Sequence, residues 1–521
     1  MRITVALLAA IVFVAGLRWG TFAAGGSDSY CYVHQAELWA TGPLQAVEPL
    51  ARQAPWPDAP LTFAPAGHIP SPTVRGAAVP MCPPGLSLAM APLVLVGAGL
   101  NRPNVVFAIV PLFGALLVIA AYMLGSRYGS RVGLASALLV ACSPAFLFQL
   151  MQPMSDVPAT ALWILAIACA SGSSSAARSI RLGGPGGPVA PLTAGLATSA
   201  AILVRPNLLP MGIALGLFIL VRPERAWRER IRDAAIFAAA SAPGCIAVAM
   251  IQQMFYGSPF RSGYGPLVAL FAPSHIPANA SRYFLWMWQT HTPAWLIALA
   301  APLLLPGWLT AMLVTLAAVN VACYLPYVVF NDWWYLRFML PAIAIVTILM
   351  AAALDAILRR VAPRTGAPYT ALFAAFVGVL CVFSIREART RSVFDLARLE
   401  SRYVRAGLYV ADHLPPNALV ITSWESGSVR FYGHRTTLVW DALDPAWLDR
   451  AIAFTRARGF EPYLLFERWE EPNFRQRFTS SAIASLDWPP MAEIAGQVRI
   501  YRPEDRARYV AGESLATDYP R

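Results

Sequence analysis

The chain has 521 residues, of which 57% are hydrophobic and only 13% are charged, about half the charged share of an average soluble protein. The net charge of +12 comes from arginine alone, because the sequence contains no lysine. Almost all of this excess lies before residue 386, among the apolar runs, so we attribute it to membrane topology and not to nucleic-acid binding. The composition thus excludes an ordinary soluble protein.

The first apolar run covers residues 3–24 and follows a basic start at Arg2. A positive start, an apolar core and small residues near Ala23 and Ala24 also describe a cleaved signal peptide. However, the run is interrupted only by Arg18, and many apolar runs follow it. We therefore expect it to be retained as the first transmembrane helix.

Apolar runs long enough to cross a bilayer as helices recur through the first three quarters of the chain. They predict a polytopic α-helical membrane protein with about 11 transmembrane helices. The predicted spans are 3–24, 104–124, 132–150, 155–171, 190–205, 207–221, 233–254, 293–305, 307–330, 337–358 and 366–385. Residues 81–99 are also apolar, but counting them as a span would reverse the side of every later loop. We expect this segment to be interfacial or re-entrant.

The loops between these spans differ in charge. If the N-terminus is cytoplasmic, four arginine-bearing loops fall on the cytoplasmic side, as the positive-inside rule requires. Their arginines are Arg127, Arg131, Arg178, Arg181, those of 222–233 and those of 359–364. This topology predicts a multi-pass protein of the cell inner (plasma) membrane, with all six histidines and the C-terminal part on the outer side.

The first large outer loop covers residues 25–82 and is called the first loop below. It holds Cys31 and Cys82, the two cysteines predicted to lie outside the membrane. In an oxidising compartment these two can form a disulfide, and the alternative is that each packs separately against lipid or a helix. The other cysteines are scattered, and none form the pairs typical of a zinc site.

Two acids follow early apolar runs on the outer side. Asp28 opens the helix-like segment "GGSDSYCYVHQAELW", and Asp156 lies in "MQPMSDVPATALW". An ionisable residue beside a span is costly and is a functional candidate by default. The alternative for each is a helix cap, a role that Ser27 and Ser155 fit equally well. Two acids on one side of the membrane favour a shared site.

Two arginines stand at the outer ends of later spans. Arg205 lies in "AILVRPNLLP", where only a short turn fits between apolar runs. A phosphate or carboxylate would satisfy a buried arginine there, and snorkelling to the lipid headgroups is the alternative. "FNDWWYLRFMLP" carries Asp332 and Arg337 among aromatics typical of a membrane-interface belt. Arg337 lies one turn inside the predicted helix, where it can contact an anionic headgroup.

From about residue 386 the hydropathy drops, and short strand-like runs alternate with helical spacing. The strand-like runs are 418–423, 436–440, 462–467 and 498–503. We predict a membrane domain (1–385) followed by an extracytoplasmic α/β domain (386–521). Its "WDALDP", with Asp441 and Asp444, is typical of a turn and helix start. No catalytic, phosphate-binding or metal motif occurs in it, which favours a scaffold or acceptor-docking role.

Five short segments carry a resemblance to a known family. They are "SDSYCYVHQAELWATG", "PPGLSLAMAPL", "MSDVPATALW", "LVRPNLL" and "LRFMLP". The first and third resemble the acidic motifs of GT-C glycosyltransferases, the second resembles their Pro-Pro segment, and the last two resemble their basic positions. The most similar branch contains protein O-mannosyltransferases and lipid A aminoarabinose transferases. Ser29 departs from the family pattern, which usually has a glutamate there. The HExxxR-type loop of some mannosyltransferases is absent, which argues against assigning a protein acceptor.

The resemblance implies an enzyme that takes a sugar from a polyprenyl-phosphate carrier and transfers it, with inversion, to a hydroxyl of a glycan, lipid or protein. Asp28 would be the base that accepts the proton of that hydroxyl. Arg205 and Arg337 would neutralise the leaving phosphate. Asp156 would orient the acceptor or share a divalent metal, and no other cofactor is implied. Further candidate contacts to donor or acceptor are Tyr30, His34 and Asp332.

Two other functions remain open from the sequence. A lipid or solute transporter would also be polytopic, but such folds often show internal repeats and broken helices that meet at the midplane. We find no clear repeat, and the polar residues gather at one face of the membrane. A ligase or polymerase that uses a diphosphate-linked glycan would lack this placement of acids.

Overall fold

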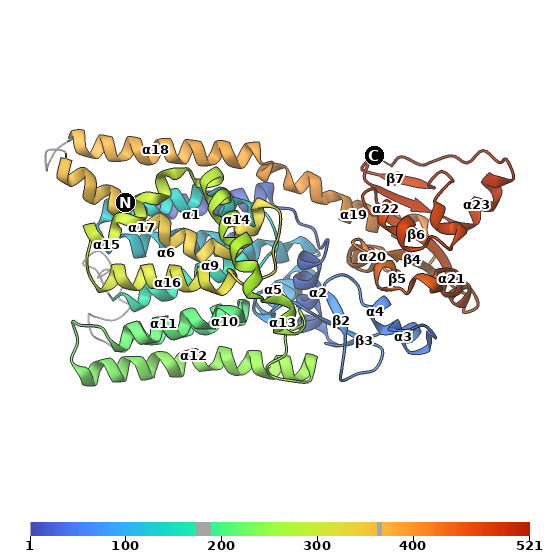
Figure 1. The fold of residues 1–521 in the computed structure, drawn as a ribbon, viewed down its shortest axis with the longest axis horizontal. Helices are drawn as coiled ribbons and strands as arrows, with labels where there is room; N and C mark the ends of the chain where they lie inside the picture. Colours follow the sequence, from blue (N-terminus) through green and yellow to red (C-terminus); the bar gives the residue numbers. More distant parts are fainter. Residues whose placement is uncertain (1, 173–188, 362–366, 521) are drawn as a thin grey trace.

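The computed structural model describes residues 2–172, 189–361 and 367–520. A bundle of long helices forms the larger part, and a smaller α/β domain built from the C-terminal residues stands at one end of it (Figure 1). The N-terminus and the turn between α11 (Leu209–Leu220) and α12 (Trp227–Tyr256) lie at the opposite end. The arginines of 222–233 belong to this turn and the start of α12, so this arginine-rich segment lies far from the C-terminal domain. Arg178, Arg181 and Arg364 fall outside the described residues.

The described helices follow the predicted spans in order. They are α1 (Arg2–Trp19), α6 (Ile109–Gly125), α7 (Ser130–Cys142), α8 (Pro144–Leu150), α9 (Asp156–Ala170), α10 (Val189–Val204), α11, α12, α15 (Ala301–Leu304), α16 (Trp308–Tyr324), α17 (Leu340–Val361) and α18 (Ala367–Thr390), with α13 (Leu267–Leu270) and α14 (Ile276–His291) in the segment between α12 and α15. Short 3₁₀ turns precede four of them: η1 (Pro103–Ala108), η3 (Pro206–Leu208), η5 (Pro293–Ala300) and η6 (Trp333–Met339). Three of these turns start with proline, whose fixed φ suits a first helical turn.

The length of the helices tests the predicted spans only in part. Among the described residues, four helices are long and apolar enough to cross a membrane, or five if α7 and α8 count as one bent span. The other apolar helices have 10–17 residues, which is shorter than the roughly 20 residues of a full span. The number of spans and their depth in a membrane therefore stay predictions.

The first helix is shorter than its predicted span. α1 ends at Trp19, whereas the apolar run continues to residue 24. After Gly20 the chain leaves the helix, and the Thr21 amide donates to the carbonyl of Met151 (2.8 Å) instead of to its own helix. This tertiary hydrogen bond holds the chain that leads to the first loop against the C-terminal end of α8.

The span predicted at 132–150 is two helices. α7 and α8 meet at an angle of 60°. Pro144 lacks the amide hydrogen that would continue α7, and Ser143 begins a new helix by accepting a hydrogen bond from the Phe146 amide. The apolar pattern alone does not reveal the bend, because both helices are buried.

The first loop folds into a small unit. Its elements are α2 (Asp28–Thr41), β1 (Ala46–Val47), α3 (Pro49–Gln53), α4 (Ala59–Thr62), β2 (His68–Pro70) and β3 (Ala77–Pro80). The strands form an antiparallel sheet in the order β1-β3-β2, which we did not predict. Cys31 of α2 and Cys82 form a disulfide, so the first of the two alternatives is confirmed. The disulfide joins α2 to the end of the loop.

The apolar segment at 81–99 forms a helix, α5 (Pro84–Gly99), with a proline in its interior. It packs against α2 and α10. Gly85 makes the contact with α10 possible, because a Cβ at this position would lie 2.4 Å from the backbone of Leu203. Its interfacial or re-entrant position stays a prediction.

The C-terminal domain is an α/β unit, as predicted. Its elements are α19 (Leu396–His413), β4 (Ala418–Thr422), α20 (Ser426–Gly433), β5 (Thr436–Val439), α21 (Leu448–Arg456), β6 (Glu461–Glu467), α22 (Glu471–Arg477), β7 (Ala492–Ile494), β8 (Val498–Tyr501) and α23 (Pro503–Val510). The strand order is β5-β4-β6-β8-β7, with β4 parallel to β5 and β6, and β8 antiparallel to β6 and β7. The four predicted strands are confirmed, and β7 is additional. Asp444 accepts a hydrogen bond from the Ala446 amide (2.9 Å), which confirms the helix start.

The first loop and the C-terminal domain share a hydrophobic core. Trp56 and Phe63 of the loop are buried beside Trp447 and Phe454, and the rings of Trp56 and Phe454 lie 5.3 Å apart. Arg430 of α20 donates to the Phe63 carbonyl (2.8 Å). Large buried aromatics dominate the energetics of such an interface, so the predicted boundary near residue 386 does not separate independent cores.

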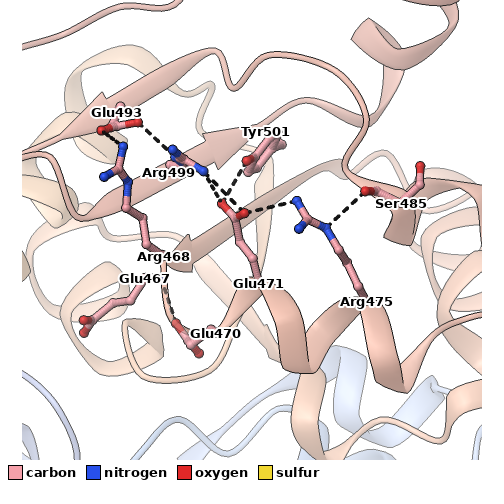
Figure 2. A network of polar contacts seen from close by, with 9 residues as sticks. All are labelled: Glu467, Arg468, Glu470, Glu471, Arg475, Ser485, Glu493, Arg499 and Tyr501. Atoms are coloured by element: carbon pink, nitrogen blue, oxygen red, sulfur yellow. Dashed lines mark hydrogen bonds and ion pairs between the residues drawn. The ribbon is translucent and has the colours of Figure 1, made fainter.

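A buried acid of the C-terminal domain is fully compensated by its neighbours. Glu471, at the start of α22, accepts hydrogen bonds from Arg475, Arg499 and Tyr501 (Figure 2). Arg499 also bonds Glu493 on β7 (2.9 Å). Charge-assisted hydrogen bonds of this kind are among the strongest in proteins, and together they offset the cost of burying the carboxylate.

A second buried acid, Glu425, has no such compensation. Ser428 donates a hydrogen bond to one of its carboxylate oxygens, but the other, Oε1, has no partner among the described residues. Arg402, a cation whose charge acts on Glu425, is instead paired with Glu467 (3.2 Å) and Glu400 (3.1 Å). Burial raises the pKa of Glu425 to about 8.

We expect Glu425→Gln to stabilise the chain at alkaline pH. The folded state keeps the Glu425 proton up to about pH 8, whereas the unfolded chain releases it near 4.5. Retention of the Glu425 proton therefore contributes to the free energy of unfolding of the wild type. This contribution is fully present below pH 4.5 and is lost as the pH rises through about 8. The loss amounts to roughly a few kcal/mol, at about 1.4 kcal/mol per pKa unit. Glutamine stays neutral, so thermal unfolding should show a variant melting temperature several degrees above wild type at about pH 8 and close to it at about pH 5.

Glu471→Gln is the matched control, since it removes a carboxylate that has cationic partners. We expect it to lower the melting temperature at both pH values, because Arg499 and Arg475 lose a charged partner. If Glu425→Gln melts at or below the wild-type temperature at alkaline pH, the explanation by an uncompensated charge is wrong.

Candidate functional site

Four ionisable residues predicted from the sequence lie close together near the start of α2, a helix that packs against α20 of the C-terminal domain. Asp28 is the first residue of α2, Asp156 is the first residue of α9, Arg205 lies between α10 and η3, and Arg337 lies in η6. They form two ion pairs. Arg205 Nη2 lies 2.5 Å from Asp156 Oδ1, and Arg337 Nη2 lies 2.9 Å from Asp28 Oδ2.

Neither acid is a helix cap. The N-cap positions of α2 and α9 are Ser27 and Ser155, and no side-chain capping hydrogen bond is formed at either helix. The carboxylates of Asp28 and Asp156 point instead to the arginines. Their place in the first helical turn adds the attraction of the helix dipole for a negative charge. The capping alternative is therefore wrong for both acids.

The pair of Asp156 and Arg205 is buried. The Asp156 side chain has 0% exposure and that of Arg205 has 10%, so Arg205 does not snorkel to a headgroup. Its other nitrogens donate to Ser155 Oγ (3.4 Å) and to the Tyr324 hydroxyl (3.1 Å). Tyr32 also donates to Ser155 Oγ (2.8 Å), and burial raises the pKa of Tyr32, so its hydroxyl keeps the proton.

The pair of Asp28 and Arg337 is more open. The Asp28 side chain is 31% exposed, so a carboxylate oxygen can reach a ligand. The Arg337 guanidinium lies over the rings of Tyr335 (5.3 Å) and Phe338 (5.0 Å), and the guanidinium of Arg205 lies 5.6 Å from the same Phe338 ring. Phe338 therefore lies between the two arginines and joins the two pairs into one cluster, which we call the ion-pair cluster.

Each pair leaves one buried polar atom without a partner. These atoms are Asp156 Oδ2 and Arg337 Nε, for which no hydrogen bond is formed within the described part of the chain. Buried polar atoms are almost always satisfied in proteins. One acceptor and one donor thus remain for a ligand that carries both kinds of group, such as a phosphate next to a sugar hydroxyl.

Sequence reasoning missed three residues of the ion-pair cluster, namely Tyr32, Ser155 as a hydrogen-bond partner, and Tyr324. Tyr32 was accessible to prediction, because it lies four residues after Asp28 and so on the same face of a helix. Tyr324 was not, because it lies at the end of α16, whose contact with Arg205 depends on the tertiary fold.

Three other predicted contacts lie outside the ion-pair cluster. Tyr30 and His34 project from α2 into a separate cavity against the C-terminal domain. Asp332 is exposed at the start of η6, and no side-chain hydrogen bond or ion pair joins it to the cluster within the described ranges. No direct contact of Asp332 with a ligand of the cluster is supported by this geometry.

The donor set for a metal ion consists of Asp28 and Asp156, each already bound by an arginine. In the part of the chain that the structure describes, no group of three or more His, Cys, Asp or Glu side chains is placed to hold a metal ion. Each acid keeps one oxygen outside its ion pair, but two arginines already compensate the charge of the two acids, which leaves no net negative charge to attract a divalent ion. These residues therefore do not fit such an ion as they stand.

No protein-family model matches the chain, and no curated protein matches it in sequence. Its fold is nevertheless similar to solved structures. ArnT from Cupriavidus metallidurans, bound to undecaprenyl phosphate, superposes with a TM-score of 0.56 at 13% identity over 96% of this chain and 97% of its own. The archaeal oligosaccharyltransferase AglB from Archaeoglobus fulgidus, in complex with an inhibitory peptide and a dolichol-phosphate, gives 0.53 at 13% identity over 92% and 71%.

A third similar structure is the arabinofuranosyltransferase AftD from Mycobacteria, with a TM-score of 0.51 at 15% identity over 90% of this chain and 35% of AftD. All three proteins are GT-C superfamily glycosyltransferases. At these identities the comparison shows a shared fold, and the chain has the GT-C fold that its motifs predicted.

Proposed function

We propose that the chain is an integral-membrane glycosyltransferase that moves a sugar from a polyprenyl-phosphate carrier to a hydroxyl group of a cell-envelope glycan, lipid or protein. In this proposal the reaction takes place at the outer face of the inner membrane. The N-terminus is cytoplasmic, and the first loop and the C-terminal domain are outside. The observation that carries the proposal is the ion-pair cluster, in which two acids and two arginines meet in a GT-C fold.

The charge of the ion-pair cluster suits a lipid-linked phosphate. Guanidinium groups recognise phosphate through paired N–H donors, and Arg337 Nε is a buried donor without a partner among the described residues. Two structural neighbours are described with carriers of this class, a dolichol-phosphate for AglB and undecaprenyl phosphate for ArnT. We assign Arg205 and Arg337 to the carrier phosphate.

Asp28 is the proposed base. It accepts the proton of the acceptor hydroxyl while that oxygen attacks the anomeric carbon of the donor sugar. The bond from the anomeric carbon to the phosphate oxygen breaks, and its electron pair stays on the phosphate, where Arg205 and Arg337 stabilise the charge. Displacement in one step inverts the anomeric carbon. Asp156 fixes Arg205 and offers Oδ2 to orient the acceptor.

The pairing of Asp28 with Arg337 is the resting arrangement in this proposal. When the carrier phosphate binds, it competes with the Asp28 carboxylate for the Arg337 guanidinium. Binding of the donor thereby releases the base next to the bond that is to be broken. This order protects the exposed carboxylate until the donor is in place.

The test of the proposed function is a transfer assay with the purified chain in liposomes. A radiolabelled polyprenyl-phosphate sugar is supplied on the outer side together with a cell-envelope extract as acceptor pool. A covalent, label-bearing product that depends on the protein supports the proposal. Movement of label across the bilayer without any covalent product would support a transporter instead.

A further inference from the structure

A cavity of about 420 Å³ lies between the first loop and the C-terminal domain. Its wall is formed by α2 and the β1-β3 edge of the first loop on one side, and by α20 and the start of β5 on the other. Ligand pockets typically have volumes of about 300 to 1,000 Å³, so the cavity can hold a small molecule or one unit of a larger one.

Two faces of α2 point to two different sites. Asp28 and Tyr32 lie four residues apart and face the ion-pair cluster. Tyr30, His34 and Glu37 follow the spacing of the other helical face and line the cavity. At about 1.5 Å of rise per residue, His34 lies roughly 9 Å along the helix from Asp28. One rigid helix therefore fixes the cavity relative to the proposed base.

The cationic groups of the cavity wall are already used by the protein. Arg430 donates to the Phe63 carbonyl (2.8 Å) and to Thr437 Oγ1 (2.7 Å), and Glu48 lies 3.8 Å from it. Arg435 donates to backbone carbonyls, among them that of Leu414 (2.7 Å). An anionic ligand would find no uncommitted arginine on this wall within the described residues.

The polar groups of the cavity wall that remain for a ligand are of a different kind. The Glu37 side chain forms no hydrogen bond or ion pair within the described ranges, and burial raises its pKa to about 7. His34 Nδ1 lies 3.0 Å from His68 Nε2, and burial lowers the pKa of His34 to about 4 and that of His68 well below its usual value. At neutral pH both imidazoles are uncharged, so each ring donates with one nitrogen and accepts with the other. His68 Nδ1 also lies 3.5 Å from the Ala66 carbonyl, so His68 uses both nitrogens within the protein, and His34 Nε2 is the imidazole nitrogen left for a ligand among the described residues.

Glu37 and the uncharged imidazole of His34 match the hydroxyl groups of a ligand, because a hydroxyl group can both donate and accept a hydrogen bond. The ring of Tyr30 stacks on His34 with 5.1 Å between centroids and lies edge-on to Phe431, so flat apolar faces border the polar groups. Neutral hydrogen-bonding groups beside aromatic rings suit a sugar ring, which has polar edges and apolar C–H faces. A cation would be repelled by Arg430 and Arg435 on the same wall, and burial of Glu37 opposes the ionised carboxylate that would attract it.

We propose that the cavity lined by Tyr30, His34, Glu37 and His68 binds a neutral sugar unit of a substrate, outside the ion-pair cluster where the bond is made. The proposal rests on the proposed glycosyltransferase function for the identity of the substrate, either the acceptor glycan or the donor sugar. The binding itself needs no catalysis, so it is measurable separately.

The test uses the purified full chain in detergent micelles and saturation-transfer NMR. The probes are a panel of neutral methyl glycosides at millimolar concentration, with acetate, inorganic phosphate and tetramethylammonium as charged probes. We expect wild type to bind at least one neutral glycoside, and Glu37→Leu and His34→Phe each to weaken it about 10-fold through loss of hydrogen bonds. His34→Phe keeps a ring for Tyr30 to stack on.

Two controls isolate the cavity. Asp58→Asn changes an exposed acid of the same loop that does not line the cavity, and asparagine suits its left-handed backbone (φ 52°). We expect it to bind the glycoside as wild type does. Asp28→Asn should also retain binding, since Asp28 faces the ion-pair cluster. The proposal is overturned if only charged probes bind, if none bind, or if binding survives both cavity variants.

Kinetics distinguish the two sources of the sugar. If Glu37→Leu raises the KM of the acceptor about 10-fold with kcat unchanged, the cavity holds the acceptor glycan, and a rise confined to the donor KM assigns it to the donor sugar. A rise in neither, with glycoside binding already lost, would show that the cavity serves no substrate and would overturn the proposal. Glycoside binding in a chain that shows no transfer would instead defeat the proposed function and leave the sugar site intact.

Discussion

Asp28→Asn should abolish sugar transfer, with kcat falling by about 10²- to 10⁴-fold, the usual contribution of a general base. Asparagine is nearly isosteric with aspartate but cannot accept the proton of the acceptor hydroxyl. The measurement is the rate of covalent product formation in liposomes at saturating donor. The fold should persist, because the Asp28 side chain is 31% exposed and the amide oxygen of asparagine can still accept the hydrogen bond from Arg337.

The control for this variant is Asp332→Asn, which removes an exposed acid near Arg337 that makes no side-chain contact with the cluster within the described residues. We expect its transfer rate to equal that of wild type. The acid limb of the wild-type pH–rate profile should vanish in the residual activity of Asp28→Asn, which a purely positioning role would not cause. Transfer by Asp28→Asn at the wild-type rate would show that another group is the base.

The sequence predicted the four ionisable residues of the ion-pair cluster but not their pairing. Charged residues beside apolar runs are rare enough to stand out singly, which is how Asp28, Asp156, Arg205 and Arg337 were found. Which acid meets which arginine depends on how α2, α9, α10 and η6 pack, and no local pattern encodes this. The sequence assigned acids and arginines to separate roles, whereas the structure pairs each acid with an arginine.

The same distinction between local and tertiary information explains which parts of the fold could be predicted from the sequence. Hydropathy located the helices, because burial against lipid or neighbours selects long apolar runs. It missed the bend at Pro144 and the early end of α1, since a proline and one tertiary hydrogen bond decide these. It also missed the core shared by Trp56 and Phe454, because residues far apart in sequence form it.

The segment that begins at Asp28 shows what structure adds. Its sequence predicted a helix with one catalytic acid and two further contacts, Tyr30 and His34, at the same site. The helix instead presents Asp28 to the ion-pair cluster and Tyr30 and His34 to the cavity. A helix places residues two apart on different faces, so these contacts could not all belong to one site on α2.

Arg205→Met should affect both carrier binding and stability. It leaves the Asp156 carboxylate, with 0% exposure, buried without a cation, which typically costs about 3–5 kcal/mol. It also removes a charge-assisted contact to the carrier phosphate worth about 1.5–3 kcal/mol. We therefore expect a marked fall in melting temperature together with undecaprenyl phosphate binding that is weaker by about 10- to 100-fold.

A double variant, Asp156→Asn with Arg205→Met, separates the two effects. It buries no charge, so most of the lost melting temperature should return, whereas undecaprenyl phosphate binding should stay weak because the guanidinium is still absent. Arg222→Met is the matched control, since Arg222 also lies over an aromatic ring, that of Trp308 (5.1 Å), but follows the C-terminal end of α11, whereas Arg205 lies before its N-terminal end. Its carrier affinity should equal that of wild type. If the double variant binds undecaprenyl phosphate as tightly as wild type, Arg205 only compensates Asp156, and the phosphate must be bound elsewhere.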